Sequence, residues 1–121
     1  MQSKITINLV LWNHGRIMSY EITAQGFAAI GSDARLRVLK VLVRAGPTGL
    51  SVGDIRDRTG IAPSTLAHHL KFLAAGDVIV QEKSGRTVIN RANYDTLEHL
   101  AHFILCECCV DAPDHRGHAD G

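Results

Sequence analysis

The chain has 121 residues, the length of one small domain that can bury a hydrophobic core. Aromatic residues make up only 5% and the formal net charge is +1, so the core is expected to be aliphatic, and any nucleic-acid contact must come from local basic patches. All three cysteines lie within residues 106–109, which excludes a disulfide framework and favours reduced thiols in the cytoplasm.

Residues 1–20 are expected to be an N-terminal extension. Their apolar run, from Ile5 to Trp12, is too short to span a membrane and lacks a signal-peptide cleavage site. Partial alternation of polar and apolar residues allows a short strand here; alternatively, Met18 is the natural start of the protein. The sequence therefore predicts a cytoplasmic protein with no membrane partner.

Two helices are predicted next. The first covers residues 21–30 and contains Gly26, which lowers its helix propensity. The second covers residues 34–45, with Ser32 as a good N-cap before it, and ends at Gly46-Pro47, because proline cannot continue a helix. The apolar stripe expected to face the core on this second helix is Leu36, Leu39 and Val43.

A helix-turn-helix is predicted over residues 51–75. Ser51 to Asp54 has the S-x-x-D pattern of a capping box, which starts a helix that runs to about Arg58. Thr59-Gly60 turns the chain, and the next helix begins at about Ala62. In such a motif the second helix reads DNA. Its buried stripe is expected to be Leu66, Leu70 and Leu73.

The opposite face of this second helix is small, polar and rich in donors, with one cation. It carries Ser64, His68, Lys71 and Ala75. Such a face suits the DNA major groove, although an ordinary solvated helix has the same pattern. The elements around it decide between the two interpretations.

A β-hairpin is predicted after the reading helix, from the runs VIVQEK (78–83) and TVINRA (87–92) around Ser84-Gly85-Arg86. A hairpin at this place is a wing. Lys83 and Arg86 at its tip are expected to contact phosphates or the minor groove.

The last predicted helix runs from Tyr94 to about Cys109, with Leu97, Leu100, Ala101 and Ile104 on one stripe. A terminal amphipathic helix in so small a domain favours a dimer interface. Residues 110–121 are expected to form a flexible tail. The predicted fold is therefore mainly α with a small β-hairpin, a winged helix-turn-helix of order α-α-α-α-β-β-α over residues 21–109, dimeric through its terminal helices.

This order of elements comes with three sequence words, SDARLRVLKVL, STLAHHLKFLAAGDV and KSGR. Together they resemble the ArsR/SmtB family of dimeric winged-helix repressors, which sense metals, metalloids or thiol-oxidising stress. The resemblance covers about residues 21–109 and implies a homodimeric transcriptional repressor that binds double-stranded operator DNA and is not an enzyme.

The resemblance also assigns residues within the reading helix. Ser64, Thr65 and His68 occupy positions at which the family reads bases or phosphates, whereas His69 is expected to pack internally beside the leucine stripe. Ala62 stands where the family often has a serine N-cap, and the missing cap costs about 1 kcal/mol of helix stability.

The resemblance implies several places for an inducer. The cysteine pair that arsenic and cadmium sensors carry before the reading helix is replaced here by Ser51 and Gly53. On the last helix, Asp95, His99 and His102 do not reproduce the spacing of the family's zinc ligands. The cluster Cys106-Glu107-Cys108-Cys109 remains.

Thiolates are soft ligands that suit As(III), Sb(III), Cd(II) or Cu(I). As(III) takes three sulfurs, which Cys106, Cys108 and Cys109 supply. On an ideal helix Cys108 points away from the other two, so three-sulfur binding within one chain needs the helix to fray at its end. No permanently bound cofactor is expected; the predicted inducer is As(III) or another thiophilic metal or metalloid.

Three alternatives stay open. Redox or persulfide sensing would couple Cys106 with one of the other two cysteines, because adjacent cysteines form a strained ring. A Zn(II) or Cd(II) site with mixed ligands would use one face of the last helix, formed by His99, His102, Cys106 and Cys109. The cysteines could also be small apolar residues at the end of a dimer helix.

Overall fold

The computed structural model describes residues 11–12, 16–17 and 19–113. The elements, in chain order, are β1 (Leu11–Trp12), β2 (Arg16–Ile17), α1 (Tyr20–Ile30), α2 (Asp33–Ala45), β3 (Leu50–Ser51), α3 (Val52–Thr59), α4 (Pro63–Ala75), β4 (Ile79–Ser84), β5 (Thr87–Ala92) and α5 (Tyr94–Leu105). From α1 to α5 this is the predicted winged helix-turn-helix order. Most of the apolar run from Ile5 to Trp12, for which a short strand is one expectation, lies outside the described residues. Within those residues no helix has the length and apolar character needed to cross a membrane.

Helices α2 and α3 and the start of α4 lie where the local sequence predicts. Ser32 and Ser51 each accept a hydrogen bond from the backbone N–H three residues later, at 3.0 Å and 3.1 Å, so both predicted caps are confirmed. Gly60 ends α3 with φ +75°, a left-handed conformation that glycine adopts without steric cost. Ala62 offers no side-chain cap to α4, and Pro63 occupies its first turn.

The wing is part of a three-stranded antiparallel sheet of order β3-β5-β4. The sequence analysis missed β3, which pairs Leu50 with Asn90 of β5. Asn90 is fully buried: its amide nitrogen donates to the Leu50 carbonyl at 3.4 Å, and its Oδ1 accepts from Gln81 at 2.8 Å. This one side chain therefore joins all three strands at the base of the wing.

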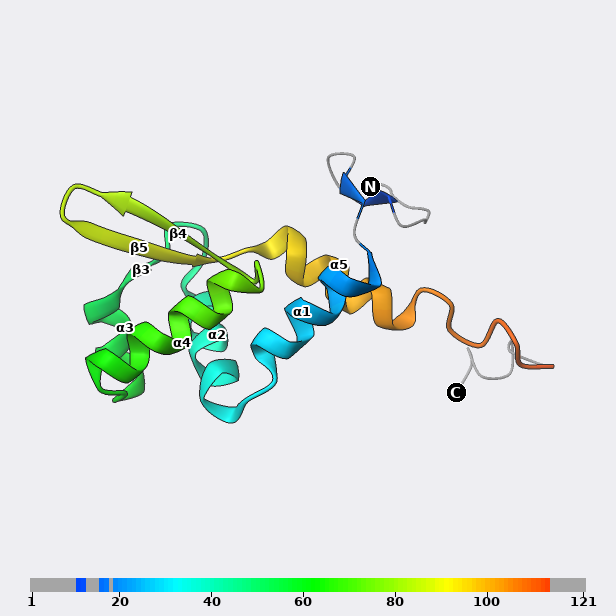
Figure 1. The fold of residues 1–121 in the computed structure, drawn as a ribbon, viewed down its shortest axis with the longest axis horizontal. Helices are drawn as coiled ribbons and strands as arrows, with labels where there is room; N and C mark the ends of the chain where they lie inside the picture. Colours follow the sequence, from blue (N-terminus) through cyan, green and yellow to red (C-terminus); the bar gives the residue numbers. More distant parts are fainter. Residues whose placement is uncertain (1–10, 13–15, 18, 114–121) are drawn as a thin grey trace.

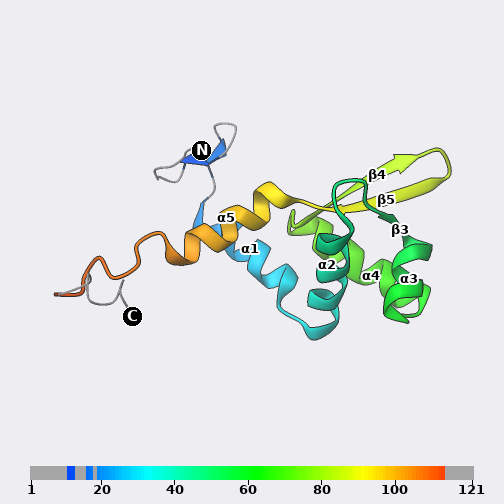
Figure 2. The ribbon, with the colours of Figure 1, turned by 180° about the vertical axis from the view of Figure 1, so that it is seen from behind.

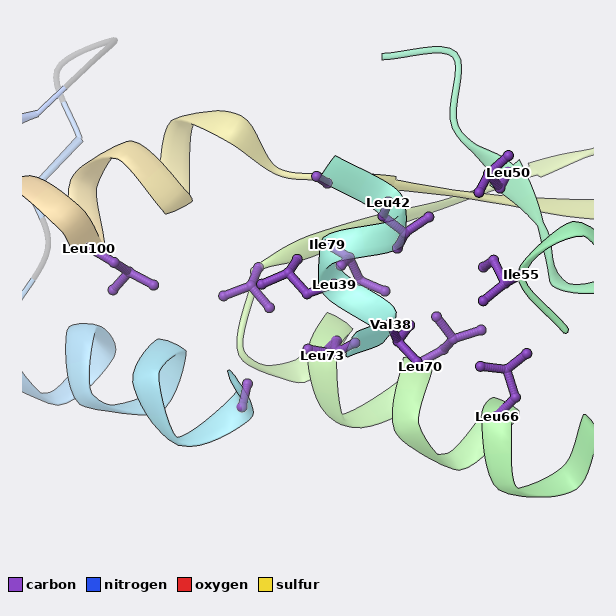
Figure 3. Packing of buried hydrophobic residues seen from close by; sticks show 13 residues of the cluster. Val38, Leu39, Leu42, Leu50, Ile55, Leu66, Leu70, Leu73, Ile79 and Leu100 are labelled. Atoms are coloured by element: carbon purple, nitrogen blue, oxygen red, sulfur yellow. The ribbon is translucent and has the colours of Figure 1, made fainter. Parts of the chain in front are cut away.

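The hydrophobic core gathers between α2, α3, α4 and the sheet (Figure 3), with Leu66, Leu70 and Leu73 of α4 buried as predicted. The predicted stripe of α2 is wrong in one position. Leu36 is 46% exposed, and the buried face consists of Val38, Leu39 and Leu42. Because α2 packs against α3, α4 and β5, its buried face is wider than a single stripe at helical spacing.

Helices α1 and α5 lie side by side at one end of the molecule, and the β4–β5 hairpin extends at the other (Figures 1 and 2). Gly26 permits this contact, because a Cβ on it would lie 3.1 Å from the side chain of Leu100. The helix-weakening glycine thus has a packing role between the two helices.

The last helix is shorter than predicted. It ends at Leu105, and the three cysteines lie in the turns that follow. Cys109 has φ +66°, which no right-handed helix can contain. The apolar stripe predicted on α5 is not buried along its whole length: Leu100 is buried, whereas Ile104 is 64% exposed.

Candidate functional site

Helix α4 presents two different faces. Its leucine stripe is buried, and the four predicted DNA-binding residues of this helix, Ser64, Thr65, His68 and Lys71, are all exposed. His69 lies between the faces, half-buried, with its Nδ1 inside the protein, so it packs internally as expected. The helix therefore presents the predicted polar side chains to solvent, opposite its buried leucine stripe.

The exposed face of α4 also contains an aromatic residue that the sequence analysis missed. Phe72 is 46% exposed, and the His68 ring meets it edge-on with 5.0 Å between ring centroids. The guanidinium of Arg35, from α2, lies over the same ring at 4.9 Å. The four-residue spacing of His68 and Phe72 signals their contact, but nothing in the sequence signals that Arg35 reaches them.

The wing runs back from the end of α4 toward the end at which α3 and α4 meet (Figures 1 and 2). Gly85 and Arg86 form its two-residue turn, Gly85 has φ +64°, and the side chains of Lys83 and Arg86 are exposed. Near the base of the wing, Arg91 bonds Glu82 at 2.6 Å and the Pro47 carbonyl at 3.0 Å. Two cations thus stand at or beside the tip, while a third anchors the hairpin.

The start of α5 is tied to the end of α4. Asp77, just beyond α4, accepts hydrogen bonds from the Asn93 amide through its carbonyl, at 3.0 Å, and from the Thr96 hydroxyl through its carboxylate, at 3.2 Å. Tyr94 adds a bond to the Val43 carbonyl of α2 at 3.0 Å. Hydrogen bonds therefore link the start of α5 both to the residue that follows the reading helix and to the last turns of α2.

The three cysteines are not gathered around one point. Cys108 Sγ and Cys109 Sγ are 3.0 Å apart, whereas Cys106 caps α5 and its thiol bonds the Phe103 carbonyl at 3.6 Å. The hydrogen bond with Cys108 raises the pKa of the Cys109 thiol, with burial as a smaller cause. Within the described part of the chain, no group of three or more His, Cys, Asp or Glu side chains is arranged to hold a metal ion.

The mixed histidine and cysteine face predicted on the last helix does not form. His99 is buried and its Nε2 contacts the Thr23 hydroxyl of α1 at 3.3 Å, so it faces the interior. Cys109 lies past the end of α5 and is no longer at helical spacing from His99. The shorter helix is the physical reason for this correction.

Large apolar side chains remain exposed along α1 and at the far end of α5. They are Tyr20, Ile22, Phe27, Ile104, Leu105 and, in the following turns, Val110. Tyr20 packs edge-on against Phe103 with 5.0 Å between ring centroids, so α1 and α5 are in contact here. The exposed apolar side chains of α1, of the end of α5 and of the turns that follow are together called the α1–α5 face below.

The comparisons with known proteins agree with the fold and with a regulatory role. A family model described as a helix-turn-helix domain matches residues 30–82. An uncharacterised HTH-type transcriptional regulator of Bacillus subtilis, YceK, is 28% identical over 85 residues, which is 69% of this chain and 84% of that relative. The transcriptional repressor SdpR of the same organism is 27% identical over 79 residues, 65% of this chain and 84% of its own.

Solved structures give the same result. An ArsR-like transcriptional regulator from Rhodococcus sp. RHA1 superimposes with a TM-score of 0.64 at 27% identity, over 83% of this chain and 90% of the other. The homodimeric winged helix-turn-helix DNA-binding domain of Mb0332 from Mycobacterium bovis shares the fold, with a TM-score of 0.59 at 21% identity over 73% of this chain and 82% of the other. These relatives are transcriptional regulators and not enzymes.

Proposed function

We propose that this chain, which has the winged helix-turn-helix fold of an ArsR-like transcriptional regulator, is a homodimeric repressor that leaves its operator when a thiophilic inducer binds its cysteines. The inducer in this proposal is As(III), and its ligands are Cys106, Cys108 and Cys109. The observation that carries the proposal is the polar face of α4 beside a basic wing, joined through Asp77 to α5, the helix that these cysteines follow.

DNA binding is assigned to two surfaces. Ser64, Thr65, His68 and Lys71 would meet base edges and phosphates of the major groove, since their side chains are exposed on a helix whose opposite face is locked in the core. Lys83 and Arg86 would meet phosphates or the minor groove beside it. The net charge of +1 makes these local cations the main source of attraction to DNA.

The proposed dimer uses the α1–α5 face. Tyr20 is 82% exposed and Leu105 66% exposed, and apolar surface of this extent is stabilised when a second copy covers it. A two-fold dimer would present two reading helices to successive major grooves. The M. bovis domain, which shares the fold, is itself homodimeric.

The inducer would act on the same face. Cys108 and Cys109 already bring two sulfurs together, and Cys106 is the third thiol within reach of a rearranged turn. The cysteines lie outside regular helix, so that such a rearrangement breaks few hydrogen bonds. A possible transcriptional regulator for arsenical resistance, 21% identical with a TM-score of 0.59, shares the fold over 80% of this chain. Reordering these turns would disturb Leu105 and Val110 and hence the dimer.

A fluorescence anisotropy titration tests both halves of the proposal. Reduced protein is bound to a labelled DNA fragment from upstream of its own gene, and As(III), Cd(II), Zn(II) and a persulfide donor are added in parallel. As(III) is expected to release the wild-type protein, whereas the triple variant C106S/C108S/C109S should bind DNA and ignore As(III). Release of that triple variant by As(III) would overturn the cysteine site, and a failure to bind any fragment would overturn the operator role.

A second candidate is a thiol-redox repressor whose oxidised couple is Cys108 with Cys109, because their sulfurs lie 3.0 Å apart, and not the couple with Cys106 that ring strain between adjacent cysteines led us to expect. Release by the persulfide donor alone would establish it and remove the metalloid. The single variant C106S also distinguishes the As(III) site from the redox switch. Binding of As(III) by three sulfurs needs Cys106, whereas a redox switch confined to Cys108 and Cys109 does not. Release by Cd(II) or Zn(II) alone would point to a different metal.

A further inference from the structure

We propose that Arg35 and Phe72 are positioning residues for DNA reading, which hold the imidazole of His68 in one orientation on the exposed face of α4. The inference rests on the proposed function in one respect, namely that His68 contacts DNA. It adds a contribution from a second helix to the reading surface, because Arg35 of α2 would determine the side-chain orientation of His68 on α4.

The Arg35 side chain is held by hydrogen bonds to α1. Its Nε donates to the Ala29 carbonyl at 2.6 Å and one terminal nitrogen donates to the Ala28 carbonyl at 3.1 Å. These carbonyls belong to the last turn of α1, at the negative end of the helix dipole, where a cation is favourable; the Ala28 carbonyl also accepts the Gly31 N–H at 3.1 Å. The guanidinium is thus anchored by two bonds at the junction of α1 and α2.

The anchored guanidinium is the support for an exposed ring. It lies 4.9 Å from the centroid of Phe72, within the range of a cation–π contact. Phe72 is 46% exposed, so part of its side chain is open to solvent on α4. Arg35 covers one side of this ring, and the His68 ring contacts it at 5.0 Å with an interplanar angle of 76°.

Holding His68 matters because an exposed imidazole otherwise samples several rotamers. A side chain that is ordered before binding loses less conformational entropy when it meets a base or phosphate. Lysine could not replace Arg35, since only the planar guanidinium can donate to two carbonyls and stack on a ring at the same time. The three residues therefore form a row from the end of α1 to the reading face.

The test is a double-mutant cycle on operator affinity. Phe72→Leu is expected to weaken binding to the operator about 3- to 10-fold, with a smaller effect on unrelated DNA, and to have no further effect in a His68→Ala background. Arg35→Lys should weaken operator binding in the same way as Phe72→Leu. Phe72→Tyr should retain wild-type affinity because it keeps the ring. Leu36→Ala, at a side chain of the same 46% exposure on α2, is the control.

A second readout keeps the inference separate from the proposed function. The side-chain proton resonances of His68 in DNA-free protein should move in Phe72→Leu, since the ring current of Phe72 acts on them, and should stay in Leu36→Ala. Full additivity of Phe72→Leu and His68→Ala, or unmoved His68 resonances, would overturn the positioning role. A His68→Ala variant with wild-type operator affinity would instead overturn the assignment of His68 to DNA.

Discussion

Thr23 of α1 and His99 of α5 meet inside the protein, with 3.3 Å between Oγ1 and Nε2. The Thr23 hydroxyl has one hydrogen and already gives it to the Ser19 carbonyl at 2.8 Å. His99 must therefore carry its hydrogen on Nε2 and donate it to Thr23. This bond fixes the ring tautomer and joins the two helices that carry the α1–α5 face.

Thr23→Val removes the acceptor of His99 without changing the volume of the side chain. We expect the free energy of unfolding to fall by about 1–3 kcal/mol, because a buried polar group loses its partner. Urea unfolding at a fixed protein concentration measures the change. Thr87→Val, at an exposed position of β5, should change it by less than about 0.5 kcal/mol; equal effects of the two variants would contradict the structural role of Thr23.

Asp77 is expected to matter for both its backbone and its carboxylate. It has φ +64°, which aspartate and asparagine tolerate better than alanine. Its carboxylate accepts a hydrogen bond from the Thr96 hydroxyl. Asp77→Ala should therefore cost about 1.5–3 kcal/mol of stability, and Asp77→Asn much less because it keeps an acceptor oxygen. Thermal unfolding of the two variants gives the order, and an Asn variant as weak as the Ala variant would show that the charge itself is required.

Gly76 and Gly53 should respond to alanine with opposite signs. A Cβ on Gly76 would lie 2.4 Å from Ala29 Cβ and 3.0 Å from the Gln25 carbonyl, so α1 must move away from α4 at a cost of about 1–3 kcal/mol. A Cβ on Gly53 has its nearest neighbour at 3.8 Å, and alanine there should add up to about 1 kcal/mol by helix propensity. Chemical denaturation of both variants tests the contrast.

Arg86→Ala should weaken binding to every DNA sequence. If its guanidinium neutralises a phosphate, the slope of log K against log salt falls by about 1 for each protomer on the DNA. Anisotropy titrations over a range of salt concentrations measure it. Arg37→Ala is the matched control, because the charge of Arg37 is already paired with Asp33 on α2. An unchanged slope for Arg86→Ala would remove the wing tip from the interface.

The raised pKa of Cys109 predicts a slow reaction with iodoacetamide below that pKa, since only the thiolate reacts. Cys108→Ala removes the main cause of the shift, the hydrogen bond between the two thiols. The pKa of Cys109 should then fall toward its ordinary value of 9.0, and its alkylation between about pH 7 and 9 should become faster. Mass spectrometry at several pH values follows Cys109 alone; an unchanged pH profile would contradict the hydrogen bond.

Local chemistry explains which parts of the fold were predictable. The caps at Ser32 and Ser51, the turn at Gly60 and the leucine stripe of α4 depend on residues within a few positions of one another, and all were predicted. The exposed reading face followed from the same helical spacing.

The remaining features depend on partners that are distant in sequence. Strand β3 exists because Leu50 pairs with Asn90, forty residues later, and two residues alone carry no strand signal. The predicted end of α5 was wrong because apolar and cysteine residues continue past Leu105 at spacings that still suit a helix. The contact of Arg35 with Phe72 crosses from α2 to α4, and no local pattern contains it.

Helices α1 and α5 bury few apolar side chains within a single chain, and this has a consequence for gene dosage. Of the buried hydrophobic core in the described residues, only Ala29 and Leu100 come from these helices, while the α1–α5 face stays open in a single chain. If a second copy closes this face, mass action sets how much complete regulator exists at a given number of copies in the cell. Scarce protein would then leave the operator vacant with no inducer present, and the threshold of the response would depend on expression level as well as on the thiols.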